Sequence, residues 1–164
     1  MTFPAWHDVF YLGERHIPTN GWPGLRESVS RVRRVIFDEL DLGADKIIIG
    51  GFSQGGVVAL ATAFHTDIKL AGIMSFSGFY PNPHKENSKA EIKLSTNVTT
   101  PVFLGHGTAD PVVLFEAAEC THSALSEENV PVTFKKYENL QHSVSLNEMR
   151  DACDFMDRVL ELSD

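Results

Sequence analysis

The chain of 164 residues is 43% hydrophobic and 22% charged, and it carries a formal net charge of −8. This length and composition are typical of one globular domain with a sizeable core, so we expect residues 1–164 to form a single domain. The acidic balance argues against nucleic acid or an anionic membrane as a partner. No stretch is apolar for long enough to form a membrane-spanning segment.

The amino terminus and the cysteines bear on the compartment. Met1-Thr2-Phe3-Pro4 lacks the basic start and the apolar run of a secretory signal. Cys120 and Cys153 both fall in helical patterns, which indicates free thiols in a reducing environment. We therefore expect a cytoplasmic protein, in which the glycosylation sequon at Asn97 is a chance match.

The first third of the chain predicts a helix, then a strand, a turn and a second helix. Residues 1–22 show no clear period, and Trp6 there is either a packing aromatic or a binding residue. Between residues 24 and 42 apolar side chains recur at steps of three or four, with arginines on the other side. A solvated helix face explains these arginines more simply than an anion site does. Residues 46–52 then indicate a buried strand, and residues 54–65 a buried helix.

Three further strands are predicted in the rest of the chain. Residues 70–76 and 101–105 form apolar runs, and between them residues 79–100 are polar and loop-like. Residues 131–137 alternate like an edge strand, with two lysines that would guard the edge.

Two helices accompany these later strands. Apolar positions between Leu114 and Leu125 recur at helical spacing. The last helix begins with a capping box, from Ser145 to Glu148. We expect its core face to consist of Met149, Ala152, Met156 and Val159 or Leu160.

Strands that alternate with helices predict an α/β protein with a mostly parallel sheet flanked by helices. Ligands of such sheets bind at the carboxyl ends of the strands. The loops that directly follow the strands are therefore where functional residues are expected.

The loop after the first predicted strand has the form G-x-S-x-G, from Gly51 to Gly55 with Ser53 at its centre. A strand, a sharp turn and a helix are the context that a nucleophile elbow requires. Such a turn raises the serine hydroxyl above the sheet, and the helix N-terminus stabilises negative charge beside it. The alternative is a Gly-rich turn with a solvent-facing serine.

Two later loops supply the partners that a nucleophilic serine needs. Asp110 follows the strand over residues 101–105, and His142 follows the strand over residues 131–137. The chain order Ser, Asp, His is that of an α/β-hydrolase. His142 would take the hydroxyl proton as general base, and Asp110 would hold the imidazole in the correct tautomer. The backbone N–H of Gln54, the residue after the nucleophile, would donate to the oxyanion.

Other histidines and carboxylates are weaker candidates. His106 lies beside the acid loop and is a rival base, but it ends the same strand as Asp110, so we interpret it as loop packing. Asp8 and Asp67 have no matching loop position, and Asp110 could also be a simple turn residue. The five remaining histidines show no ligand spacing, which argues against a metal site; they are His7, His16, His65, His84 and His122.

Taken together, these segments resemble the acyl-protein thioesterase, lysophospholipase and carboxylesterase family of α/β-hydrolases. Residues 50–56 match its elbow almost letter for letter, and residues 106–113 and 137–143 resemble its acid and histidine loops. Residues 5–8 resemble its Trp-aromatic-Asp segment, with His7 where an aromatic is usual, and residues 77–81 resemble the loop after its next strand.

The resemblance implies a serine hydrolase that acts on thioesters or oxygen esters with acyl chains, without a cofactor. It makes Ser53, Asp110 and His142 the catalytic triad. The substrate would be an acylated small molecule, a lipid or an S-acylated protein. The family implies that Phe79 and the apolar run from Val113 through Leu114 to Phe115 line an acyl groove, and Trp6 is a further candidate for substrate binding.

The resemblance covers only the carboxyl-terminal two-thirds of the family fold. Family members begin with three or four more strands, and a His-Gly-rich loop after one of them supplies the second oxyanion N–H. We therefore expect an N-terminally truncated α/β-hydrolase fold in which Ile47-Ile48-Ile49 lies at an exposed, apolar sheet edge. Loss of one oxyanion donor typically costs ~10²–10³ in turnover.

Three accounts of this departure are open. The chain is a fragment or short product of an ordinary hydrolase, or it forms a homo-oligomer that covers the exposed edge, or it has lost catalysis and kept the binding of acyl ligands.

Overall fold

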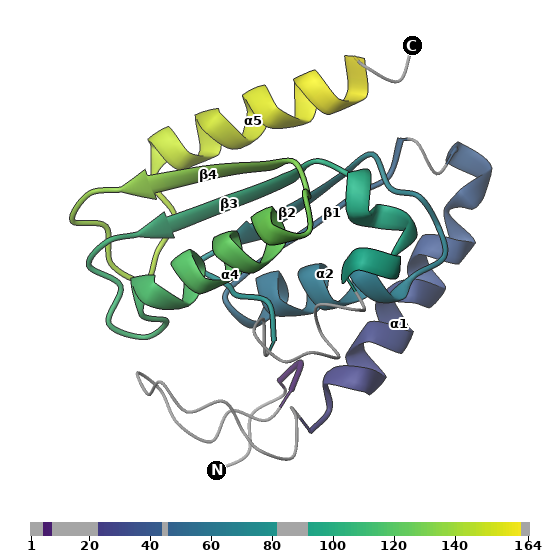
Figure 1. Cartoon of the computed structure of the whole chain (residues 1–164), viewed down its shortest axis with the longest axis horizontal. Coiled ribbons are helices and arrows are strands. Elements are labelled where there is room, and N and C mark those ends of the chain that lie inside the picture. Colours follow the sequence, from purple (N-terminus) through teal and green to yellow (C-terminus); the bar gives the residue numbers. More distant parts are fainter. Residues whose placement is uncertain (1–4, 8–22, 44–45, 82–91, 162–164) are drawn as a thin grey trace.

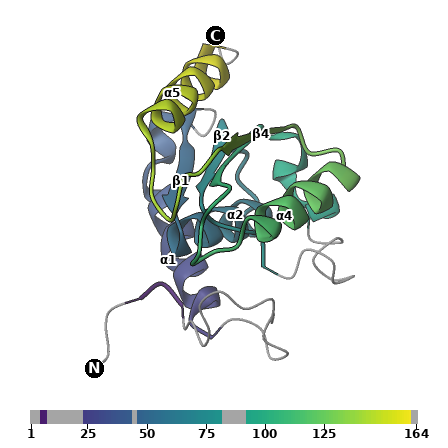
Figure 2. The same cartoon turned by 90° about the vertical axis from the view of Figure 1, so that its left-hand side faces the viewer.

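Four parallel strands form the centre of the protein, and helices cover both faces of the sheet (Figures 1 and 2). This computed structural model describes residues 5–7, 23–43, 46–81 and 92–161. The strands lie in the order β1-β2-β3-β4, with each neighbouring pair parallel. This architecture confirms the predicted α/β class. The strands are β1 (Ile48–Phe52), β2 (Gly72–Phe76), β3 (Val102–Gly107) and β4 (Val132–Tyr137).

Several α-helices surround this sheet. On one face α2 and α4 lie against the strands, and α1 packs on α2; α5 lies alone on the other face (Figure 2). Two short 3₁₀ helices, η1 and η3, also form, and residues 92–94 are helical. The bounds are α1 (Leu25–Asp38), η1 (Leu40–Leu42), α2 (Gln54–His65), η3 (Thr96–Thr99), α4 (Phe115–Glu127) and α5 (Leu146–Glu161).

Each face of the sheet has its own hydrophobic core. The larger core joins α1, α2 and α4 to the sheet and includes Leu60, Ile73 and Leu125, each fully or almost fully buried. The smaller core lies under α5, where Phe103 of β3 packs against Phe155 with ring centroids 5.7 Å apart. The sheet is therefore buried on both sides, as parallel sheets usually are.

The bounds of most elements agree with the sequence pattern. The helix over residues 54–65 is confirmed at both ends, and β4 is an edge strand as its alternation predicts. The third strand was predicted to end at residue 105 but continues to Gly107, because His106 and Gly107 pair with Lys136 and Tyr137 of β4. The stretch over residues 79–100 is not wholly a loop, since η3 forms within it.

The predicted core face of the last helix is confirmed at Ala152 and Val159, but it is wrong by one residue at the start of the helix. Met149, which was placed in the core, is 48% exposed, and Leu160, the alternative to Val159, is 38% exposed. The buried residues of the face are Glu148, Ala152, Phe155 and Val159. A hydrophobic pattern assigns Met149 and Met156 to the core in preference to Glu148. It therefore places the buried face one residue too late at the start of the helix.

One edge of the sheet is formed by β1. Its outer side is not paired with any strand among the described residues. The isoleucines expected at an exposed apolar edge are largely covered by helices: Ile49 is buried, and Ile47 and Ile48 are half-buried. Within the described ranges, none of the helices combines the length and apolarity needed to cross a bilayer.

Asn97 joins three segments beneath the sheet. Its side chain is fully buried, and its Nδ2 donates to the carbonyls of Ala63 and Ile68 at 2.9 and 2.8 Å. Its Oδ1 accepts from the Leu70 N–H and the Thr100 hydroxyl, both at 2.8 Å. All the hydrogen-bonding capacity of the amide is therefore used inside the fold.

Replacing this amide should destabilise the protein strongly. We expect Asn97→Ala to lower the free energy of unfolding by about 3 kcal/mol, because it leaves a buried N–H and buried carbonyls without partners. Denaturant unfolding would measure the change. As a control, Asn147→Ala removes an exposed amide and should stay within about 0.5 kcal/mol of wild type; similar losses in both variants would contradict the assigned role.

Candidate active site

Three loops meet at one rim of the sheet. Ser53 directly follows β1, Asp110 lies three residues after β3, and His142 lies five residues after β4. Because the strands are parallel, their carboxyl ends point the same way (Figure 1). The structure therefore brings together three side chains that lie 89 and 32 residues apart along the chain.

The backbone at Ser53 has an unusual conformation. Its φ of 55° and ψ of −120° lie in a region that L-residues rarely adopt, at a cost of about 1–3 kcal/mol. The turn is held by the Ser53 N–H, which donates to the Phe76 carbonyl at 2.8 Å. Strain of this kind at an exposed turn between strand and helix is the signature of a nucleophile elbow.

Glycine at position 51 is required by the tightness of this turn. A Cβ at Gly51 would lie 2.3 Å from the carbonyl carbon of Gly55 in the first turn of α2. At Gly55 itself a Cβ would meet nothing within 4 Å. Of these two glycines in the motif, the first therefore permits the close approach of strand and helix.

A continuous hydrogen-bonded chain links the three loops. The His142 Nε2 lies 3.0 Å from the Ser53 Oγ, and the His142 Nδ1 lies 2.7 Å from the Asp110 Oδ2. Both distances are within hydrogen-bonding range. In this arrangement one ring nitrogen contacts the hydroxyl while the other contacts the carboxylate, so a proton taken from Ser53 would leave an imidazolium beside a negative charge.

Asp110 is held in its loop by several donors. Its other oxygen, Oδ1, accepts from the backbone N–H groups of Val112 and Val113, both at 2.9 Å. Burial alone would raise the pKa of the Asp110 carboxyl, but the hydrogen bonds from His142 and from these two amides outweigh it, so the pKa is lowered. Asp110 is therefore a carboxylate at neutral pH.

The imidazole of His142 is fixed from a second side by Phe52. The two ring centroids are 4.7 Å apart, with the planes tilted by 41°. Phe52 is 40% exposed, so its ring covers His142 at the surface instead of packing in a core. In the sequence, Phe52 has no role beyond its place in the motif, because no residue pattern reveals this contact.

His106, the rival base, lies away from the hydroxyl. It is buried, and its Nε2 contacts the Val113 carbonyl at 2.8 Å and the Asp110 Oδ2 at 3.5 Å. Burial lowers the pKa of this imidazole despite the nearby carbonyl and carboxylate, so His106 is neutral at pH 7. These contacts agree with a packing role in the acid loop.

Gln54 begins α2, so its backbone N–H is one of the donors that have no partner within the helix. Its side chain has a second set of contacts that sequence analysis missed. The Gln54 Oε1 accepts from the Trp6 N–H at 3.2 Å, and Nε2 donates to the His7 carbonyl at 3.3 Å. The Ser28 hydroxyl also donates to the Trp6 carbonyl. These bonds tie residues 6 and 7 to the elbow.

Of the residues predicted to bind substrate, Trp6 alone lines one of the two hollows described here. Trp6 lines a small apolar one of about 120 Å³, beside β1 and between α1 and α2. Phe79, Val113 and Leu114 are half-buried and line neither this hollow nor the larger one described next. Val113 and Leu114 nonetheless follow Asp110 closely in the acid loop.

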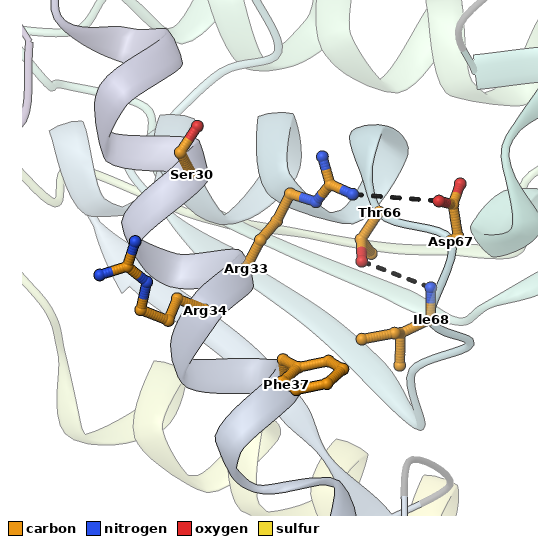
Figure 3. A pocket seen from close by; sticks show the side chains of 7 residues that line it. All are labelled: Ser30, Arg33, Arg34, Phe37, Thr66, Asp67 and Ile68. Atoms are coloured by element: carbon orange, nitrogen blue, oxygen red, sulfur yellow. Dashed lines mark hydrogen bonds and ion pairs between the residues drawn. The ribbon is translucent and has the colours of Figure 1, made fainter.

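A larger hollow of about 380 Å³ lies between α1 and residues 66–68 (Figure 3). In it Arg33 reaches toward Asp67 at 3.9 Å, with both side chains widely exposed. An exposed pair of this length contributes little stability. The hollow lies at the far end of α2 from Ser53, about 18 Å along a helix of this length, so it is separate from the cluster of Ser53, Asp110 and His142.

The described part of the chain contains no cluster of potential metal ligands. No group of three or more His, Cys, Asp or Glu side chains there is arranged to hold a metal ion. His65, at the last turn of α2, has its Nδ1 2.7 Å from the Ala61 carbonyl. Asp8, His16 and His84 lie outside the described residues.

Comparison with known proteins gives a consistent result. The sequence profile described as Phospholipase/Carboxylesterase matches residues 1–160. "Acyl-protein thioesterase 1" of Debaryomyces hansenii is 40% identical over 163 residues, covering 96% of this chain and 68% of that protein. The protein of the same name from Candida albicans is 33% identical, covering 98% and 71%.

Solved structures show the same fold. Arabidopsis thaliana SOBER1 superimposes with a TM-score of 0.83 at 30% identity, over 95% of this chain and 74% of that one. Zea mays acyl-protein thioesterase 2 gives a TM-score of 0.79 at 29% identity, over 95% and 72%.

The difference between the two elbow glycines can be tested directly. We expect Gly51→Ala to lower the free energy of unfolding by about 3 kcal/mol, because the new methyl group overlaps the α2 backbone. Gly55→Ala is the matched control: it should leave stability unchanged or raise it by about 0.5–1 kcal/mol. Thermal unfolding of both variants measures this, and equal effects would contradict the packing described here.

Proposed function

Because this chain belongs to the phospholipase/carboxylesterase family, we propose that it is a serine hydrolase that cleaves acyl thioesters or carboxylic esters. Ser53 is the nucleophile, His142 the general base and Asp110 the residue that orients the base. The observation that carries this proposal is the hydrogen-bonded chain through both nitrogens of one imidazole, 3.0 Å to the hydroxyl and 2.7 Å to the carboxylate.

The first half of the reaction forms an acyl-enzyme. The Ser53 Oγ attacks the carbonyl carbon as its proton passes to the His142 Nε2. The resulting tetrahedral oxyanion collapses and expels the thiolate or alkoxide, which takes the proton from His142. The acyl group is then bonded to Ser53.

The second half repeats the same proton transfers with water. His142 removes a proton from water, the hydroxide attacks the acyl-enzyme, and collapse of the second tetrahedral intermediate returns the proton to Ser53. The products are a carboxylic acid and the free enzyme. Throughout, the Asp110 carboxylate stabilises the imidazolium and keeps its own negative charge, which the lowered pKa of Asp110 supports.

The first turn of α2 provides the electrostatic part of catalysis. The Gln54 N–H is next to the nucleophile and at the positive end of the helix dipole. It is therefore the proposed oxyanion donor. A preassembled triad favours hydrolysis over the alternative of an acyl-binding protein without turnover, since binding alone needs no base within reach of a strained serine.

The names of the relatives support an acyl thioester on a protein as the substrate, and the description of the family supports a carboxylic ester of a lipid or a small molecule. Phe79, Val113 and Leu114 are the proposed acyl contacts near the acid loop, and Trp6 is a further one beside β1. Exposed free thiols at Cys120 and Cys153 support a cytoplasmic location. The outer edge of β1, which has no partner strand among the described residues, supports pairing of two copies, which sedimentation would detect.

Covalent labelling tests the nucleophile. We expect a fluorophosphonate probe to label the wild type and not Ser53→Ala. With a series of p-nitrophenyl esters of increasing chain length, Ser53→Ala should lose at least about 10³-fold in kcat/KM, since the acyl-enzyme cannot form. Thermal unfolding of the variant checks that it is folded. Equal hydrolysis by the two proteins would end the catalytic assignment.

The choice of base is tested by a pair of histidine variants. We expect His142→Gln to reduce kcat by about 10³-fold or more, with a melting temperature close to that of wild type. His106→Gln should instead lower the melting temperature and keep a much larger share of kcat, because His106 packs the acid loop without contacting the hydroxyl. The reverse result would make His106 the base.

A further inference from the structure

Glu148 is a buried carboxyl group that the proposed chemistry does not use. It is six residues after His142, in the first turn of α5, and it has no exposed surface. Its N–H donates to the Ser145 hydroxyl at 3.1 Å, and its Oε2 accepts from the Ser145 N–H at 3.4 Å. This reciprocal capping box fixes the end of the loop that carries His142.

The other carboxyl oxygen of Glu148 lies against β3. A Cβ at Gly105 would be only 2.3 Å from the Oε1, so the carboxyl group occupies the space that a side chain at position 105 would take. Among the described residues this Oε1 has no hydrogen-bond partner. The side chain of Glu148 therefore also packs closely against β3, the strand that precedes Asp110.

The opposite end of the histidine loop rests on the same strand. The Leu140 carbonyl accepts from the Ala109 N–H at 3.1 Å, and it lies 2.1 Å from where a Cβ at Gly107 would be. Gly105 and Gly107 are two residues apart, so they share one face of β3. The segment over residues 140–148, which includes the start of α5, thus contacts one strand at both ends, with His142 between the contacts.

We propose that Glu148 is a positioning residue for His142, holding the loop of the imidazole on β3 so that both hydrogen bonds of the triad form together. This inference rests on the proposed function. Glu148 touches neither His142 nor Ser53, and its effect passes through Ser145 and the loop backbone.

The surroundings of Glu148 favour its neutral form. The groups that face it are Asp151 on its own helix and Tyr137 on β4, whose hydroxyl donates to the Asp151 Oδ2 at 2.8 Å. Lys135 of β4 contacts the other Asp151 oxygen at 3.2 Å. Burial raises the pKa of Glu148 to about 7, and the Asp151 charge adds to this, while the bond from Ser145 opposes it.

The raised pKa of Glu148 makes the loop sensitive to alkaline pH. A carboxyl group whose pKa is higher in the folded than in the unfolded state stabilises the fold fully below its unfolded value of ~4.3. This contribution is lost as the pH rises through about 7, where the buried group becomes charged beside Asp151. The loop should therefore loosen above neutrality.

Three variants of the full chain test this role, assayed with one p-nitrophenyl ester. We expect Glu148→Ala to lower kcat by about 10- to 100-fold with little change in KM, because the base is displaced while the acyl contacts remain. Glu148→Gln, which keeps the cap, should restore most of kcat near pH 6. As a control, Asp154→Asn removes an exposed carboxylate on the same helix, and its kcat should equal that of the wild type.

The pH profile separates positioning from a structural role. Wild-type kcat should fall as the pH rises above about 7, and Glu148→Gln, which cannot ionise, should lose this fall. Two results would overturn the proposal. One is a folded Glu148→Ala variant whose kcat equals that of the wild type, and the other is identical pH profiles of kcat for the wild type and Glu148→Gln. Absence of fluorophosphonate labelling in the wild type would instead reject the hydrolase itself, so the two failures can be told apart.

Discussion

The common direction of the four strands is the constraint on which the site depends. The loop that follows each strand begins at the same rim of the sheet. Residues that are distant in sequence therefore lie close together there. The pairing of β3 with β4 matters most, because it brings the acid and histidine loops side by side. The serine arrives from β1, two strands away from β3, and the imidazole spans that gap.

Much of this could be predicted because strand, turn and helix leave separate marks in the sequence. The turn at Ser53 can be located to the residue from three features, which are an apolar β-branched run, a serine flanked by glycines and an apolar helix. The meeting of Ser53 with His142 also follows, since parallel strands leave few other places for loops that carry catalytic residue types. Gly107 marks the limit of this reasoning: it belongs to β3 but looks like a loop residue.

What could not be predicted depends on side-chain contacts between elements. Burial of Glu148 contradicts its polarity, so a hydrophobic period places Met149 in the core instead. The bonds from the Gln54 side chain to residues 6 and 7, and the contact of Phe52 with His142, join segments that no periodic pattern relates. Acyl contacts are equally hidden, because a groove is a property of several loops at once.

The position of β1 at the edge of the sheet has a consequence for local stability. Within the described chain this strand has ladder partners on one side only, while β2 and β3 have them on both. Its amide groups should therefore exchange hydrogen with solvent through small local openings, well before global unfolding. Ser53 directly follows this outer strand, so the same local openings should reach the turn that carries the hydroxyl, whereas Asp110 follows an inner strand.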